Sequence, residues 1–550
     1  MKTSLIRLLQ GLCLTVLISN LMLAQTGTQS AASSNDSANV TDQLKKLQDA
    51  MTEQQQQIAK QQQEIEKLRQ QVATQNNAAP QVVDASLHTA ANPAAVAASD
   101  MAYQGDSEKK DSPLSFRIGA AEFTPGGFVD FTNIFRSTNT GNPGGTSFGA
   151  IPFSNTIAGH DTEDRMTASN SRLSLKATSE YKGFKATGYM EMDFLGNDAT
   201  NVFVTSNSHT DRMRLYWVDI RKDKWEFLGG QSWSWLTPNR VGLSPNPSDV
   251  FYSNNEDYNY QVGLTWTRAP QFRVAYHPNE HWAIGVAAEN PEQYVGAGEV
   301  VFPFAYNAQL ATQLDANNQS TTPNVAPDII AKIAYDTEAW GRHFHIEGVG
   351  LETTVKVADL PVGGTGFVSH SATGGGGSLN MNLEVFKGFR IIANTFYSDG
   401  GGRYIFGLGP QAVIAPISTG GANTDIVTKL VHADSGIGGV EWQATKKTLI
   451  SAYYGGAYFS RNSFVDITSP LVVKPNIGFG YINSPNTANR AVQEGSFDWT
   501  QTFWKHPQYG ALQLITEYSY ITRSPWFVAA GAPKNAHLSE VLIDMRYVLP

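Results

Sequence analysis

Regular alternation of apolar and polar residues, repeated along the chain, is the feature that most constrains its fold. From Phe184 to Phe194, the even positions carry Phe, Ala, Gly, Met, Met and Phe, and the odd positions carry Lys, Thr, Tyr, Glu and Asp. Successive side chains of a β-strand point to opposite faces, so this segment predicts a strand with one apolar and one charged face. About sixteen such segments, with no helical segments between them, predict a transmembrane β-barrel with lipid outside and water inside.

The rhythm of short and long connections supports an all-β, antiparallel barrel within residues 114–550. Seven short turns alternate with eight long loops that are rich in Gly, Pro, Asn and Ser. An even number of strands leaves both termini on the short-turn side, which is periplasmic in such barrels. The predicted strands cover residues 126–136, 170–180, 183–194, 211–221, 224–233, 269–277, 282–289, 328–336, 342–350, 378–386, 389–398, 436–444, 448–459, 495–505, 509–523 and 537–549.

The composition suits this class of protein and argues against others. Aromatic residues make up 11% of the 550 residues, and 49 glycines are present, which fits aromatic girdles and tight turns. After the first 25 residues, no apolar run is long enough for a membrane-spanning helix. The net charge of -9 argues against nucleic acid as a partner.

The first 24 residues have the pattern of a secretory signal peptide. Lys2 and Arg7 form a positively charged region before the apolar stretch from Leu8 to Leu23, and the expected cleavage follows Ala24. Cys13 is the only cysteine, and Leu12 stands before it where a lipoprotein signal prefers a small residue, so we expect removal rather than lipidation. The mature chain would then carry 38 basic residues (40 minus Lys2 and Arg7) against 49 acidic ones, a net charge of -11, and no cysteine.

Residues 41–73 carry a heptad pattern that predicts a periplasmic coiled coil. The first seam position is occupied by Leu44, Met51, Ile58, Ile65 and Val72. The second is occupied by Val40, Leu47, Gln54, Gln61 and Leu68. Polar glutamine at two seam positions disfavours a tight dimer, and we expect a trimer. The alternative is a solvated, glutamine-rich, partly helical tail.

Residues 74–113, which are rich in Ala, Asn, Ser and Asp, predict a flexible linker.

This organisation resembles the DcaP-like trimeric outer-membrane porins. The local stretches that resemble this family are Ser171–Lys176, Tyr189–Phe194, Arg212–Tyr216 and Gly229–Ser234. The resemblance implies a homotrimer in the bacterial outer membrane, in contact with lipid, lipopolysaccharide and the outer-membrane assembly machinery. It also implies passive diffusion, with a preference for negatively charged organic acids in some members. One departure is the C-terminus, where Tyr547 is followed by Val548, Leu549 and Pro550 rather than ending on an aromatic residue.

A porin needs a constriction whose charges replace part of a solute's hydration, and two regions are candidates. The early strands would place Arg172, Lys176, Lys185, Arg212 and Arg214 in the lumen, with Leu173, Leu175, Met213 and Leu215 facing lipid. Such a basic ladder would attract anions. The alternative is charge balance, because Glu191 and Asp193 share that lumen and could pair with the basic side chains.

The long loop from Leu236 to Arg268 is the second candidate. Prolines stiffen it, and its charged residues are Arg240, Asp249, Glu256 and Asp257. We expect this loop to fold inward and narrow the pore. The alternative is an outward cap at the trimer axis.

No residue pattern indicates catalysis, a cofactor or a metal centre. Nucleophile-elbow, phosphate-loop and zincin motifs are absent from the sequence. His343 and His345 share a strand face beside Glu347, but this spacing is too common to predict a metal site. A structural hypothesis stands beside the porin: the coiled coil would tether the envelope, with peptidoglycan as partner and the barrel as an anchor.

Overall fold

The computed structural model describes residues 112–550, except residues 143, 197–207, 252, 297 and 317–321. The predicted signal peptide, coiled coil and nearly all of the linker lie outside the described residues. These three assignments therefore stay predictions. No helix within the described segments is long and apolar enough to cross a membrane.

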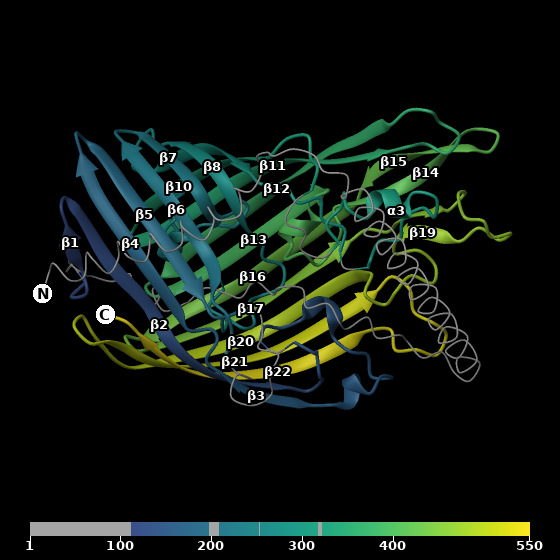
Figure 1. Cartoon of the computed structure of the whole chain (residues 1–550). Helices are drawn as coiled ribbons and strands as arrows, with labels where there is room; N and C mark the ends of the chain where they lie inside the picture. Colours follow the sequence, from purple (N-terminus) through teal and green to yellow (C-terminus); the bar gives the residue numbers. More distant parts are fainter. Residues whose placement is uncertain (1–111, 143, 197–207, 252, 297, 317–321) are drawn as a thin grey trace, which may run out of the picture. The chain divides into compact units, whose positions relative to one another are not determined.

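A closed antiparallel β-barrel of sixteen strands forms the described part of the chain (Figure 1). The predicted all-β antiparallel barrel and all sixteen of its predicted strands are confirmed. The barrel strands are β2 (Ala121–Arg136), β4 (Arg172–Tyr181), β5 (Phe184–Asp193), β6 (Arg212–Lys222), β7 (Trp225–Trp233), β8 (Arg268–Tyr276), β9 (Trp282–Glu289), β10 (Asp328–Ala339), β11 (Arg342–Asp359), β12 (Val368–Phe386), β13 (Phe389–Asp399), β16 (His432–Thr445), β17 (Thr448–Phe459), β20 (Asn489–His506), β21 (Gly510–Pro525) and β22 (Ala536–Val548).

The first and last barrel strands close the barrel. β2 pairs with β22 from Phe128 opposite Val548 to Arg136 opposite Glu540, and its other edge pairs with β4. Two short strands, β1 (Phe116–Ile118) and β3 (Glu163–Thr167), lie against the ends of β2. Closure matters because a barrel wall has no open edge, so the backbone groups of its strands are paired within the wall.

Burial along the strands is inverted relative to a water-soluble barrel. In β8, Phe272 is 77% exposed and Val274 is 41% exposed, whereas Gln271 and Arg273 are 4% and 5% exposed. The same alternation of exposed and buried residues runs through β11, β17 and β20. A wall with apolar side chains outside and polar side chains inside is stable only where an apolar phase surrounds it.

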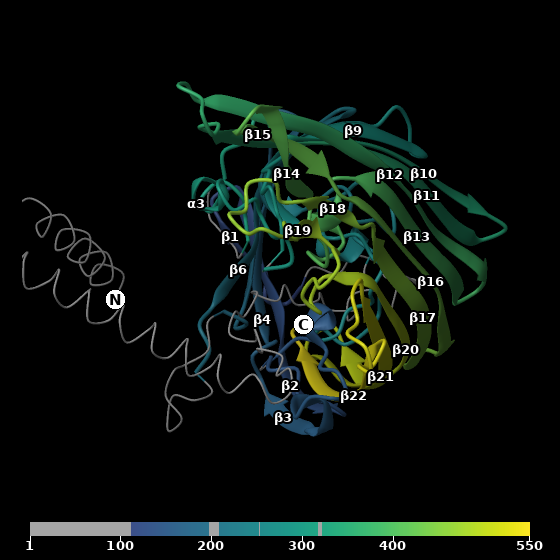
Figure 2. The same ribbon diagram turned by 90° about the vertical axis from the view of Figure 1, so that its right-hand side faces the viewer.

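The two ends of the barrel differ. At one end, short turns connect the strands, and in the Lys182-Gly183 and Trp340-Gly341 pairs both residues have positive φ, which matches the twist of a tight hairpin. At the other end the long loops gather (Figure 2). They carry α3 (Asn307–Leu310), the hairpin β14 (Ala412–Gly420) and β15 (Asn423–Leu430), and the hairpin β18 (Asn462–Val465) and β19 (Asn476–Phe479).

Neither of these hairpins was predicted from the sequence, and the predicted β11 and β12 were too short. The predicted strands were 342–350 and 378–386, but the two strands stay paired up to Asp359 opposite Val368. The run of glycines from Gly374 to Gly377 looks like a loop signal, yet it lies within β12. At Gly374 a Cβ atom would collide with the Asp399 carbonyl, so glycine here permits close strand packing.

We predict that a charge on the outer wall destabilises the barrel far more than a charge on a loop. Phe272→Arg should lower the free energy of unfolding by about 2–4 kcal/mol, because it places an uncompensated charge in lipid. The measurement is reversible denaturant unfolding in lipid vesicles. Ile157→Arg, at a position that is 90% exposed on a long loop, is the control and should be nearly neutral. Equal effects would contradict the lipid-facing assignment.

Candidate pore constriction

Residues 234–267, which connect β7 to β8, lie inside the barrel. Most of the described residues of this segment, here called the inner loop, are buried, and none of them is exposed. Their partners are lumen-facing side chains of β11, β13, β16, β17, β20, β21 and β22, which include the strands farthest from β7 and β8 around the wall. The inner loop therefore reaches across the lumen.

A buried ion pair anchors the first half of the inner loop. The Arg240 guanidinium donates two hydrogen bonds to the Glu441 carboxylate of β16, at 2.7 and 2.8 Å. The Tyr453 hydroxyl of β17 donates to the same carboxylate at 2.6 Å, and Arg240 also stacks over the Phe251 ring. A paired, two-pronged contact of this kind fixes orientation as well as charge.

Amide groups of the inner loop satisfy two carboxylates of the opposite wall. Asn259 donates through Nδ2 to Glu494 at 2.7 Å and to Glu517 at 2.6 Å. The backbone N–H groups of Val262 and Glu256 donate to Glu494 and Glu517 at 2.7 and 2.5 Å. Neutral donors, rather than cations, thus cover these two wall carboxylates.

The acidic residues of the inner loop meet an arginine of the closing strand. Arg546 of β22 contacts Glu256 at 3.1 Å, Asp257 at 3.0 Å and Asp130 of β2 at 2.8 Å. This guanidinium lies between the three carboxylates and compensates part of their charge. Asp249 is different: it is half-buried and forms no ion pair within the described residues.

Five of the seven charged residues predicted for the early strands form one network. Arg214 contacts Glu191 at 2.6 Å and Asp193 at 2.7 Å, Arg212 contacts Asp193 at 2.6 Å, and Arg172 lies 3.8 Å from Glu191. Arg172 also lies 3.8 Å from Asp257 of the inner loop, which joins the two predicted regions. These contacts are the ones expected from the alternative to a basic ladder, in which Glu191 and Asp193 pair with the basic side chains of the lumen.

The two lysines of the predicted ladder stand apart from this network. Lys176 is half-buried and Lys185 is exposed near the short turn, and neither forms an ion pair among the described side chains.

The expectation that Leu215 faces lipid is wrong, because Leu215 is fully buried. A β-bulge makes Arg214 an extra residue between Met213 and Leu215, so the alternation of faces reverses there.

Other lumen residues were missing from the sequence analysis. Arg268, at the start of β8, is half-buried, lies 5.3 Å from the centre of the Trp233 ring, and has a buried Nη1 atom without a hydrogen-bond partner in the described structure. The wall carboxylates Glu441, Glu494 and Glu517 were also missed. Their alternate positions in predicted strands could have shown that they face inward, but not what they bind.

The histidines of β11 take part in ion pairs. His345 lies 2.9 Å from Asp336 and 3.2 Å from Glu347, and Glu347 also contacts Lys332 at 2.9 Å. His343 lies 3.2 Å from the same Asp336 oxygen. The charged groups of these inner-wall side chains are therefore paired with one another.

Comparison with solved structures shows that the fold is similar to that of a known outer-membrane channel. The outer-membrane channel DcaP of Acinetobacter baumannii is similar in structure, with a TM-score of 0.50 and 18% identity over 78% of this chain and 97% of that one. OmpT of Vibrio cholerae (TM-score 0.41, 10% identity, 79% and 99% covered) and an anion-selective porin of Comamonas acidovorans (0.41, 10%, 78% and 99%) are more distant, and no argument rests on them.

No family model matches the chain, and no curated protein sequence matches it. The similarity in fold to the DcaP channel confirms, at the level of the fold, the resemblance to DcaP-like porins that the sequence suggested.

We predict that the Arg240–Glu441 pair couples the inner loop to the wall. Arg240→Met should lower the free energy of unfolding by about 3–5 kcal/mol, because it leaves the Glu441 carboxylate buried and uncompensated. Arg240→Met combined with Glu441→Leu should recover most of this loss. Chemical denaturation of the native protein, of Arg240→Met, of Glu441→Leu and of the double variant measures the coupling free energy between the two residues. Additive losses in the double variant would contradict a direct pairing.

Proposed function

We propose that the chain is an outer-membrane porin that allows passive diffusion of small hydrophilic solutes. The observation that carries this proposal is an inside-out barrel crossed by an internal loop: the wall suits a membrane, and the lumen is lined with charged and amide groups. The similarity of this fold to that of the DcaP channel supports the same proposal. A homotrimer in the outer membrane, with the N-terminal coiled coil in the periplasm, is part of the proposal.

The inner loop would act as the constriction. It carries Arg240, Asp249, Glu256 and Asp257, and all but Asp249 are bound to the wall, so its position in the lumen is fixed before a solute arrives. Arg240, Glu256 and Asp257 are nearly inaccessible to solvent, so the loop would narrow the pore by its fixed volume rather than by direct contact of these charges with a solute. No catalytic group is required for such a role.

Anionic organic solutes fit the distribution of accessible charge best. The wall carboxylates Glu494 and Glu517 are 0% and 2% exposed, because the inner loop covers them. The cations Lys176, Arg212 and Arg268 remain partly exposed. Exposed cations focus a positive potential in a narrow pore, whereas the net negative charge of loops and tail is screened beyond about 8–10 Å.

The envelope tether is the second candidate, and it rests on the heptad pattern of residues 41–73 rather than on the barrel. Conductance of the barrel alone separates the two roles. A fragment beginning at residue 113 contains all sixteen barrel strands and should insert into planar bilayers and conduct ions. A closed barrel would favour the anchor.

We predict that the open pore prefers anions to cations. Under a salt gradient, the reversal potential of the native pore should have the sign of anion selectivity. Lys176→Gln combined with Arg212→Gln should reduce the anion-to-cation permeability ratio by about half or more, because partly exposed lumen charges set the local potential. Lys182→Gln, at an exposed short turn, is the matched control and should leave the ratio unchanged.

Cation selectivity of the native pore would overturn the anion proposal. An unchanged ratio in the double variant would move the selectivity filter to the inner loop and leave the porin proposal intact.

A further inference from the structure

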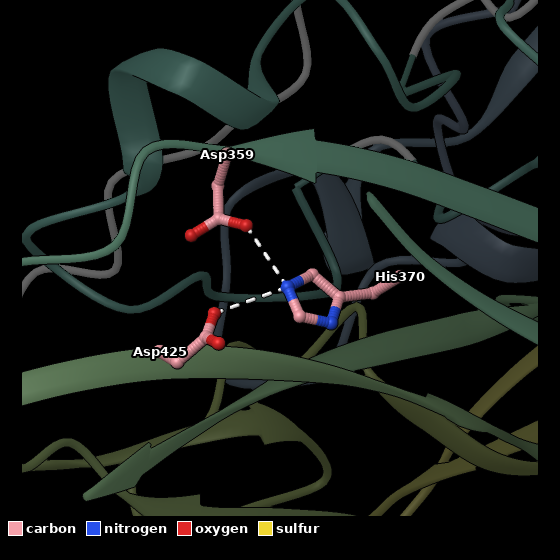
Figure 3. A group of neighbouring side chains, drawn as sticks. All are labelled: Asp359, His370 and Asp425. Atoms are coloured by element: carbon pink, nitrogen blue, oxygen red, sulfur yellow. Dashed lines mark hydrogen bonds and ion pairs between the residues drawn. The ribbon is translucent and has the colours of Figure 1, made fainter. Parts of the chain in front are cut away.

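Three side chains from three strands meet at the long-loop end of the barrel (Figure 3). Asp359 is the last residue of β11, His370 lies near the start of β12, and Asp425 lies on β15 of the long-loop hairpin. The His370 Nε2 atom is 3.0 Å from an oxygen of Asp359 and 3.0 Å from an oxygen of Asp425. One possible ligand atom from each residue lies within 4.8 Å of the others.

The surrounding backbone fixes this arrangement. β11 and β12 pair with Val357 opposite His370, and Val362 pairs with Thr424, the neighbour of Asp425. The buried Tyr306 hydroxyl donates to the Thr424 carbonyl and accepts from the Val362 N–H. The wall hairpin and the loop hairpin are therefore held together beside the three side chains.

The electrostatics of this cluster are unbalanced. Asp359 is only 2% exposed, and its second carboxylate oxygen is buried without a hydrogen-bond partner in the described structure. Burial, followed by the facing Asp425 carboxylate, raises the pKa of Asp359. Two carboxylates that face each other across one imidazole leave negative charge at this point, and a dication would compensate both.

The donor set and its spacing fit a transition-metal ion better than Mg²⁺ or Ca²⁺. Imidazole nitrogen together with carboxylate oxygen is typical of zinc and its neighbours, while the lighter cations prefer oxygen alone. Ligands bound to one zinc ion at about 2.0–2.2 Å lie roughly 3.0–3.5 Å apart, which the two nitrogen–oxygen distances match. His370 and Asp425 are each 17% exposed, so an ion can enter from the solvent side.

We propose that Asp359, His370 and Asp425 form a binding site for a divalent transition-metal ion, of which Zn²⁺ is the type. The ion would join β15 of the loop hairpin to the extended ends of β11 and β12. A transmembrane strand needs about 9–11 residues, so the far end of the 18-residue β11 lies outside the membrane. The sequence predicted no metal site because the three ligands are distant along the chain.

The test is calorimetric titration of Zn²⁺ into the full mature chain in detergent, after removal of metal by a chelator. We expect one strong site per chain. His370→Gln and Asp425→Asn should each weaken binding about tenfold or more, because each removes a direct ligand.

His432→Gln is a matched control. His432 also pairs with two aspartates, but its Nδ1 atom is 2.9 Å from Asp399 and its Nε2 atom is 2.8 Å from Asp434. Opposite edges of one ring cannot share an ion, so this variant should bind Zn²⁺ as the native chain does. Unchanged binding in the His370 and Asp425 variants, or an equal loss in the control, would overturn the proposal.

A second measurement covers variants that fail to fold, as judged by loss of heat-modifiable mobility. Crystals of the unaltered protein, soaked in Zn²⁺, should show an anomalous-scattering peak between the three side chains. Absence of a peak there would overturn the site. Because neither measurement depends on conductance, a failed porin proposal and a failed metal site remain distinguishable.

Discussion

Hydrogen bonding between the inner loop and the carboxylates of the facing wall is the interaction on which the interior of this barrel depends. A barrel of sixteen strands encloses more space than wall side chains can fill. Glu441, Glu494 and Glu517 face into that space, and each is nearly inaccessible to solvent. Without Arg240, Asn259 and the backbone donors of the inner loop, these buried carboxylates would lose most of their hydrogen-bond partners, which is costly. The wall and the inner loop therefore stabilise each other.

The way in which each charge is compensated connects this packing to permeation. On the β20–β21 side, neutral amides cover the carboxylates, so negative charge remains but is withdrawn from the solute. On the β4–β6 side, arginines pair with Glu191 and Asp193, and Lys176 stands outside the pairs. On this wall the accessible unpaired charge is the cation Lys176, although the whole chain is acidic. Selectivity in this account follows from what is accessible rather than from net charge.

Much of the fold follows from local sequence, and much of the site does not. Two-residue periodicity and turn residues are short-range signals, and they were sufficient for all sixteen strands. The same periodicity failed at Leu215, because a bulge adds one residue without a sequence signal. The partners Arg240 and Glu441 are 201 residues apart, so their contact depends on barrel closure and loop placement together. The pairing of Arg172 with Asp257 and the meeting of His370 with Asp425 have the same origin.

Single-channel conductance of a barrel with a shortened inner loop tests the central claim most directly. Residues 238–262 would be replaced by a short Gly-Ser linker, which removes the groups that cross the lumen and leaves every wall strand in place. Heat-modifiable mobility would first establish that this barrel folds. The account predicts a severalfold rise in conductance and weaker discrimination between solutes, because water would then fill the space that the loop occupies. An unchanged conductance in a folded barrel would contradict the placement of the inner loop across the pore.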